Sequence, residues 1–294
     1  MSGRQVIITG DDFGMSVEVN EAVEEAHRRS VLTSASLVVA GDAAADAIAR
    51  ARRMPALGVG LHIALLHAPA ALSREQIADL IDENGRGFGR EVWKIGSKIA
   101  LFPHVRRQAL AELRAQFELF RKSGLTLDHV DGHKHFHQHP WLLGALIALA
   151  PEYGIRAIRL PRESALHSWR AAGRVGLSHR LFDVAAHWPL LTLMRRMLRS
   201  AGIVSNDWFF GKHDGGAIGR SWVLRLLEGL PPGVSEIGLH PARGPWPPPY
   251  GPPARWRVAE ELAALTDPDV IAACRQPGIR LAKFSDLTAE GVPC

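Results

Sequence analysis

The chain has 294 residues, of which 47% are hydrophobic and 22% are charged, as in a globular protein that buries a sizeable core. This length fits one large domain or two small ones, and we expect a single domain over residues 1–294. The net charge of +5 and the isoelectric point of about 9.6 indicate a basic surface. No long Lys/Arg run or basic-aromatic repeat accompanies that charge, so we expect no nucleic-acid partner.

Targeting signals are weak in this sequence. The chain enters an apolar strand at Gln5 without a basic segment and a leader-like apolar stretch, so we expect no secretory signal. The longest apolar runs, WLLGALIALA and VAAHWPLLTLM, are too short to span a membrane. The two cysteines, Cys274 and Cys294, do not indicate a disulfide framework. These features predict a cytoplasmic location.

Strand-like apolar runs alternate with amphipathic helical patterns along the chain. Ser16 is expected to cap the first helix, because its hydroxyl can accept a hydrogen bond from a free amide of the first turn. Strands are predicted at residues 5–9, 34–40, 58–63, 126–131, 155–160, 234–239 and 279–284, with a weaker signal at 203–209. Helices are predicted at residues 17–29, 42–53, 105–123, 140–151, 219–230 and 257–265.

This alternation predicts the fold class. Strands that are apolar almost throughout and alternate with helices favour a parallel sheet covered by helices. Seven or eight such strands predict an α/β fold that closes, or nearly closes, into a (β/α) barrel of the TIM type. A doubly wound open sheet is the alternative. In a barrel, the polar residues that follow the strands would meet at one end, where barrel enzymes build their active sites.

Two segments interrupt the alternation. Residues 244–254 form a proline-rich loop, which is either a stiff connection or a wall of an active site. Residues 163–202 form a long insert rich in Trp, Leu and Arg. Within this insert, residues 179–200 join apolar side chains to Arg195, Arg196 and Arg199. This stretch is either a basic amphipathic helix that lies on an anionic bilayer or a core helix with a charged edge.

Five of the 14 histidines fall within one run of eleven residues, in the sequence DHVDGHKHFHQHP. Because neutral imidazole is a common metal ligand, this density indicates an inward-facing site for a divalent metal ion. His129, Asp131 and His133 alternate at a period of two and therefore share one strand face, whereas His135 and His137 are expected in the following loop. A non-specific metal-binding patch is the alternative, and the embedded carboxylate argues against it.

Three further strand ends carry polar residues. Asp11 and Asp12 follow the first predicted strand, where adjacent carboxylates repel unless a cation or hydrogen bonds compensate them. Acidic residues just before a helix are also favoured by its dipole. His62 lies in an apolar strand and is either a satisfied core residue or a ligand. His240 ends a later strand, and because histidine changes its charge near neutral pH, it could act as a general acid. Together these clusters indicate a metal-dependent hydrolase.

Four motifs, in this order and spacing, resemble the YdjC-like carbohydrate deacetylases, also called the chitooligosaccharide deacetylase group. They are ITGDDFGMS, GLHIAL, HVDGHKHFHQHP and EIGLHPAR. The C-terminal segments ELAALTDPDV and GIRLAKFSDL also look like that family, so the resemblance covers essentially the whole chain. It implies a distorted (β/α) barrel, one divalent metal ion and removal of acetate from an N-acetylated amino sugar.

The resemblance also implies roles for individual residues. Asp12, His62 and His133 would bind the metal, Asp11 would be the catalytic base, and His240 would protonate the leaving amine. The choice of His133 rests on its position two residues after Asp131, so the question of which histidine in this motif binds stays open. The remaining polar residues of the motifs would contact the substrate or support the ligands: Asp131, His129, His135, His137 and Arg243.

The sequence leaves more than one choice for the metal ion and for the substrate. One carboxylate with two imidazoles accepts zinc, magnesium, manganese or cobalt, and we expect zinc or magnesium. The insert and the proline-rich loop resemble the hopanoid-biosynthesis-associated branch of the family. That resemblance implies a glycosylated hopanoid lipid as substrate and peripheral contact with the inner face of the membrane. A soluble chitooligosaccharide is the alternative substrate, and a second copy of the chain is a further expected partner.

Two other functional classes compete with this interpretation. An amidohydrolase or phosphoesterase on a barrel usually begins with His-x-His on the first strand, whereas this first strand ends in Asp-Asp. A metal- or lipid-binding protein without activity would explain neither the additional carboxylate of Asp11 nor His240. The sequence therefore favours a metal-dependent deacetylase.

Overall fold

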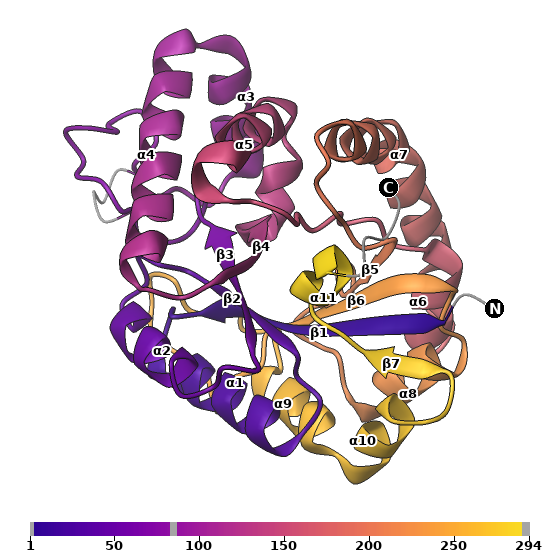
Figure 1. Ribbon diagram of the computed structural model, residues 1–294. Helices are drawn as coiled ribbons and strands as arrows, with labels where there is room; N and C mark the ends of the chain where they lie inside the picture. Colours follow the sequence, from indigo (N-terminus) through magenta and orange to yellow (C-terminus); the bar gives the residue numbers. More distant parts are fainter. Residues whose placement is uncertain (1–2, 83–86, 290–294) are drawn as a thin grey trace.

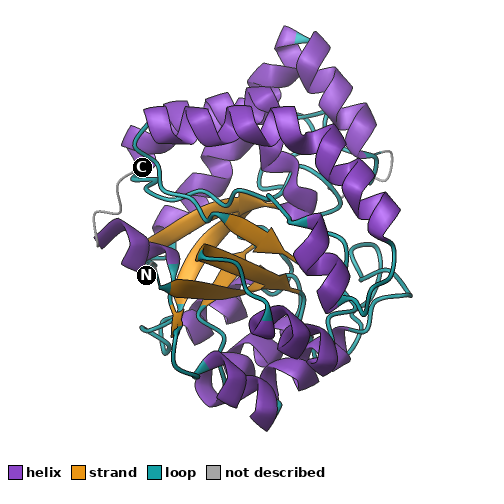
Figure 2. Ribbon diagram, turned by 90° about the vertical axis from the view of Figure 1, so that its right-hand side faces the viewer, coloured by secondary structure: helices purple, strands orange, loops and turns teal. Residues whose placement is uncertain are grey.

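Parallel strands form a curled sheet at the centre of the molecule, and helices surround it (Figures 1 and 2). The computed structural model describes residues 3–82 and 87–289, so Cys294 lies outside the described residues. The described strands are β1 (Arg4–Phe13), β2 (Ser34–Leu37), β3 (Gly58–Ile63), β4 (Leu127–Gly132), β5 (Trp208–Phe210), β6 (Gly233–Leu239) and β7 (Ile279–Leu281). Six of them pair in the order β4-β3-β2-β1-β6-β5, which agrees with a distorted TIM-like barrel.

The helices pack around the outside of this sheet. Neighbouring helices touch in pairs such as α1 with α2, α8 with α10 and α6 with α7. The described helices are α1 (Val17–Arg29), α2 (Ala44–Ala51), α3 (Val92–Leu101), α4 (Pro103–Lys122), η1 (His133–Gln138), α5 (Pro140–Tyr153), α6 (Ala165–Ala171), α7 (Leu177–Ser200), α8 (Arg220–Glu228), α9 (Val258–Thr266), α10 (Pro268–Cys274) and α11 (Phe284–Ala289). The Ser16 hydroxyl accepts a hydrogen bond from the Val19 amide, so the predicted cap of α1 is confirmed.

The barrel is irregular at two places. Between β4 and β5, the chain makes only isolated parallel bridges, at Val130–Ile158 and Ala157–Val204. The predicted strand over residues 155–160 is therefore reduced to these bridges, because the side chain of Asn206 replaces a backbone partner and bonds both the amide and the carbonyl of Leu160. The weaker strand signal at residues 203–209 corresponds to the short strand β5.

The second irregularity is at β1. Its first residues, Arg4–Val6, pair with β7, whereas its last residues pair with β2 on the same side. Strand β7 is therefore inserted at the amino end of the barrel, and it ends at Leu281, earlier than predicted. Helix α11 follows it, and the amides of Phe284 and Ser285 at its start donate to the carboxylate of Asp128 in β4.

The interior of the barrel is filled by polar and aromatic side chains, for which glycines make room. A Cβ on Gly60 would lie 2.4 Å from the ring of His129, and a Cβ on Gly238 would lie 2.6 Å from the ring of Phe209. No real Cβ tolerates such distances, so larger residues would push these rings out of place. The glycines therefore let the rings of His129 and Phe209 occupy the space between the strands.

The insert forms α6 and α7; the helix indicated over residues 179–200 matches α7, whereas α6 was not placed from the sequence. The C-terminal half of α7 buries Leu191, Met194 and Leu198 in the core. Its N-terminal half instead exposes large apolar side chains, including Phe182, which is 76% exposed, and Trp188. The C-terminal half is therefore a core helix, whereas contact of the N-terminal half with a bilayer stays a prediction. No helix in the described part of the chain is long and apolar enough to cross a membrane.

Candidate metal centre

A distortion of β1 brings both of its terminal carboxylates into the barrel. In a regular strand, adjacent side chains point to opposite faces. Here the pairing of β1 with β2 shifts between Gly10 and Phe13, and Asp12 has a φ of 63°. Aspartate tolerates this left-handed region better than most residues, and such strain is found at functional sites. Asp11 and Asp12 can therefore both face the same centre.

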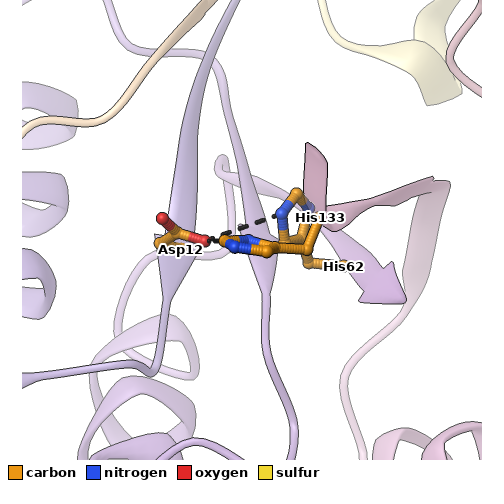
Figure 3. Close-up of side chains that lie close together, drawn as sticks. All are labelled: Asp12, His62 and His133. Carbon is orange, nitrogen blue, oxygen red and sulfur yellow. Dashed lines mark hydrogen bonds and ion pairs between the residues drawn. The ribbon is translucent and has the colours of Figure 1, made fainter. Parts of the chain in front are cut away.

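Three side chains converge above the carboxyl end of the sheet (Figure 3). The Asp12 Oδ1 atom lies 2.9 Å from Nδ1 of His133 and 3.6 Å from Nε2 of His62. All three residues are buried, and their potential ligand atoms lie within 4.8 Å of one another. They come from the ends of β1, β3 and β4, which is where the barrel prediction placed them.

A layer of ion pairs supports these three residues from below. The Asp131 Oδ1 atom accepts a hydrogen bond from Nδ1 of His62 at 2.8 Å, which fixes that ring and leaves its Nε2 directed at Asp12. Arg159 lies at the centre of the layer. Its guanidinium donates to both oxygens of Asp11 at 2.8 Å and to Glu236 at 2.7 Å, and it forms an ion pair with Asp131 at 2.5 Å.

The charges of this cluster are unbalanced. Burial alone would lower the pKa of His62, but the carboxylate of Asp131 outweighs it and raises that pKa to about 9. Burial alone would raise the pKa of Asp12, yet the rings of His133, His240 and His62 hold it well below its usual range. The carboxylates and the imidazole rings thus stabilise each other's charged forms.

These residues fit a divalent metal ion. Asp11, Asp131 and Glu236 pair with the guanidinium of Arg159, whereas the buried Asp12 has only histidine partners among the described residues. A cation beside Asp12 would supply the charged partner that a buried carboxylate needs. One carboxylate and two imidazoles is a donor set found in metal sites of hydrolases. The arrangement can therefore hold a metal and keep Asp11 beside it.

A chain of hydrogen bonds runs from this layer toward the amino end of the barrel. The Ser36 hydroxyl donates to Asp131 at 3.0 Å and lies 3.1 Å from Nε2 of His129. The other ring nitrogen of His129 pairs with Asp128 at 3.0 Å, and Phe284 stacks on the ring at 4.5 Å. His129 is thus connected to the candidate ligand His62 through Ser36 and Asp131.

A pocket of about 600 Å³ opens above the cluster. Its lining includes His240, whose ring lies 4.4 Å from that of Trp256 and whose backbone amide donates to the buried Glu261. The Nδ1 atom of His240 is buried without a partner among the described residues, so it is available to a ligand. Trp246 and Tyr250 of the proline-rich loop also line the pocket, so this loop forms one of its walls.

The other predicted residues are placed differently. His135 lines the pocket, and its ring contacts Phe209 at 4.8 Å. His137 is buried below, where its Nε2 donates to the carbonyl of Arg159. Burial lowers the pKa of His137 to about 4. Arg243 pairs instead with Glu21 and Glu25 on α1 and is absent from the pocket lining, so the structure does not bring it to the cluster.

Sequence reasoning missed two residues of this centre. Both are fully buried; Arg159 lies in none of the motifs, and Glu236 begins the motif EIGLHPAR but was given no role there. The available signal was a charged residue inside an apolar strand pattern, as in IRAIRL and SEIGL. A charge in such a position needs a buried partner. The partners could not be named, because they lie on strands distant in sequence.

Known proteins resemble this chain over nearly its whole length. A carbohydrate deacetylase of Geobacillus stearothermophilus is 30% identical over 285 residues, covering 96% of this chain and 98% of the relative. A mouse carbohydrate deacetylase is 31% identical, covering 98% of each chain. A solved structure from Enterococcus faecalis, described as a cellobiose-phosphate cleavage protein, superposes with a TM-score of 0.71 at 26% identity, covering 97% of this chain and 99% of the other. The family model of YdjC-like proteins matches residues 5–276, and the chain therefore belongs to the YdjC-like family.

Proposed function

We propose that the protein is a metal-dependent deacetylase that removes acetate from an N-acetylglucosamine group. The observation that carries the proposal is the buried convergence of Asp12, His62 and His133 beside a second carboxylate, Asp11, beneath an open pocket. The family relatives named carbohydrate deacetylases support the reaction class. A bound divalent ion, zinc or magnesium in our proposal, would acidify water and polarise the acetyl carbonyl.

The residues around the metal would divide the proton transfers between them. Both oxygens of Asp11 are held by Arg159, which fixes the carboxylate as a base that takes the proton of the attacking water. The water oxygen adds to the carbonyl carbon, and the carbon–nitrogen bond then breaks. His240, which also lines the pocket, would give a proton to the departing nitrogen. Acetate and a free amine result, so the atoms and charges balance.

We further propose that the sugar is attached to a lipid, of the glycosylated hopanoid type, and that the enzyme acts at the cytoplasmic surface of a membrane. The exposed apolar side chains of α7, with Leu181 53% and Phe182 76% exposed, support this proposal. Arginines also lie on the same insert, including Arg174 and Arg196, and would attract anionic headgroups. A soluble chitooligosaccharide is the competing substrate.

Acetate release tests the activity. Purified protein loaded with zinc or magnesium is offered N-acetylglucosaminyl hopanoid and diacetylchitobiose in parallel, with chelated protein as the control. We expect release that depends on metal and is faster with the lipid-linked sugar. Release from chitobiose alone would leave the deacetylase assignment intact and contradict the lipid. No release from either substrate would contradict the deacetylase assignment.

Vesicle binding tests the membrane contact separately. The double variant Leu181→Ser/Phe182→Ser is expected to sediment with phosphatidylglycerol vesicles at least about fivefold more weakly than the wild type, because two apolar anchors are lost. Leu119→Ser on α4 removes an exposed leucine from another helix and is expected to bind like the wild type. Wild-type protein that stays in the supernatant at low salt would refute the contact.

A further inference from the structure

A second cavity lies directly beside the metal-site pocket. It has a volume of about 280 Å³, its lining is mostly apolar, and it is formed mainly by the insert. The lining residues are Pro161, Arg162, Glu163, Ser164, Ala165, Asp183, Val184, His187, Trp188, Leu191, Trp208 and Lys212. Helices α6 and α7 thus contribute none of the candidate metal ligands but enclose a space at the edge of the site.

This cavity and the metal-site pocket share a lining residue, Lys212. Its backbone amide donates to Glu163 at 2.8 Å, and the next residue, His213, pairs with the same carboxylate at 2.9 Å. Asp183 of α7 accepts from the ammonium of Lys212 at 2.6 Å. These contacts fasten the insert to the rim, so a molecule bound over the metal ligands has the cavity immediately beside it.

The lining of the cavity suits an amphipathic ligand. Trp188 and Trp208 flank Arg162, with the guanidinium carbon 5.0 Å and 4.3 Å from the two ring centres. No carboxylate lies within ion-pair distance of Arg162 in the part of the chain that the structure describes. Its donors are therefore free for an ether or hydroxyl oxygen, while the indole faces and Leu191 offer apolar surface.

We infer that this cavity is a subsite for the group attached to the amino sugar, and that this group is apolar with an oxygen at its attachment point. The inference rests on the proposed function, because it takes the acetamido sugar to lie in the neighbouring pocket. Burial of each additional methylene in such a subsite favours binding by about fourfold when the burial is complete. Substrates with longer apolar groups are therefore better substrates.

Alkyl glycosides test the subsite. Methyl and octyl glycosides of N-acetylglucosamine, below their micellar concentrations, are compared by acetate release with the metal-loaded protein. We expect kcat/KM for the octyl glycoside to exceed that for the methyl glycoside by at least about tenfold. In Trp188→Ala this ratio falls by at least about fivefold, while the methyl glycoside is turned over as by the wild type. Equal rates for both glycosides with the wild type would overturn the subsite and leave the deacetylase assignment standing.

Two further variants make the test specific. Trp93→Ala removes a tryptophan that is 70% exposed on α3 and lines none of the described cavities, so the octyl preference should persist. Val184→Trp fills the cavity from α7 and should remove the preference. Loss of the preference in Trp93→Ala, or its survival in Val184→Trp, contradicts the subsite.

A binding measurement separates the two levels of inference. Calorimetric titration of both glycosides onto the same proteins does not depend on turnover. If neither glycoside releases acetate, tighter binding of the octyl glycoside that is lost in Trp188→Ala still supports the subsite, whereas the proposed reaction fails. Equal affinities in that case overturn both.

Discussion

Replacement of Asp11 by Asn is expected to lower kcat by about two to four orders of magnitude while the protein keeps its bound metal. The amide cannot take a proton from water, yet it has almost the shape of the carboxylate. Arg159 would keep Asp131 and Glu236 as charged partners, so its buried guanidinium is not left unpaired. The measurements are acetate release at saturating substrate and metal content after dialysis.

The matched control is Glu236→Gln. This change also removes one carboxylate from Arg159, but Glu236 does not line the metal-site pocket. We expect it to lower thermal stability, because a buried ion pair loses one partner, and to leave kcat within about threefold of the wild type. If Asp11→Asn retains activity comparable to that of Glu236→Gln, Asp11 is not the base.

The sequence predicts the barrel and the convergence of the motifs because both depend on local patterns. Apolar runs that alternate with helices predict parallel strands, and polar residues at their carboxyl ends must then meet. The predicted third strand, residues 58–63, matches β3, and His62 lies inside it. The predicted N-cap at Ser16 is likewise a property of adjacent residues.

Features that depend on contacts between distant segments could not be predicted from local sequence patterns. The left-handed conformation of Asp12, with a φ of 63°, arises where β1 changes its register against β2, and no local pattern encodes that shift. The strand around residues 155–160 is interrupted because Asn206, nearly fifty residues away, takes its hydrogen bonds. Arg159 could be recognised as unusual but could not be paired with Asp11.

The division of α7 into two halves has the same origin. Its composition is basic and apolar throughout, and the mean pattern does not separate a core face from an open one. Only the packing of the helix decides that Leu198 is buried while Phe182, one of its own apolar residues, is left exposed. The insert thereby has one half that packs into the core and one half whose large apolar side chains are exposed.

Replacement of His62 by Ala is expected to abolish detectable activity and to weaken metal binding by at least about a hundredfold, since even residues that only orient ligands are worth about ten- to hundredfold in metal affinity. Asp131 would lose one partner but keep Arg159 and Ser36, so the fold should persist. Metal content after dialysis and the dissociation constant for zinc are the measurements. Normal metal occupancy in this variant would refute the ligand role.

His135→Ala is the control for His62→Ala, because His135 belongs to the histidine-rich motif and lines the same pocket without approaching Asp12. It is expected to keep the metal at the wild-type level. Added imidazole should partly restore zinc binding to His62→Ala, since the vacated space is shaped for that ring and still contains the Asp131 acceptor. Rescue of this kind distinguishes the loss of a ligand from general damage to the barrel, which no small molecule would repair. Loss of the metal in His135→Ala would move the third ligand from His133 to His135, because the two residues come from the same turn.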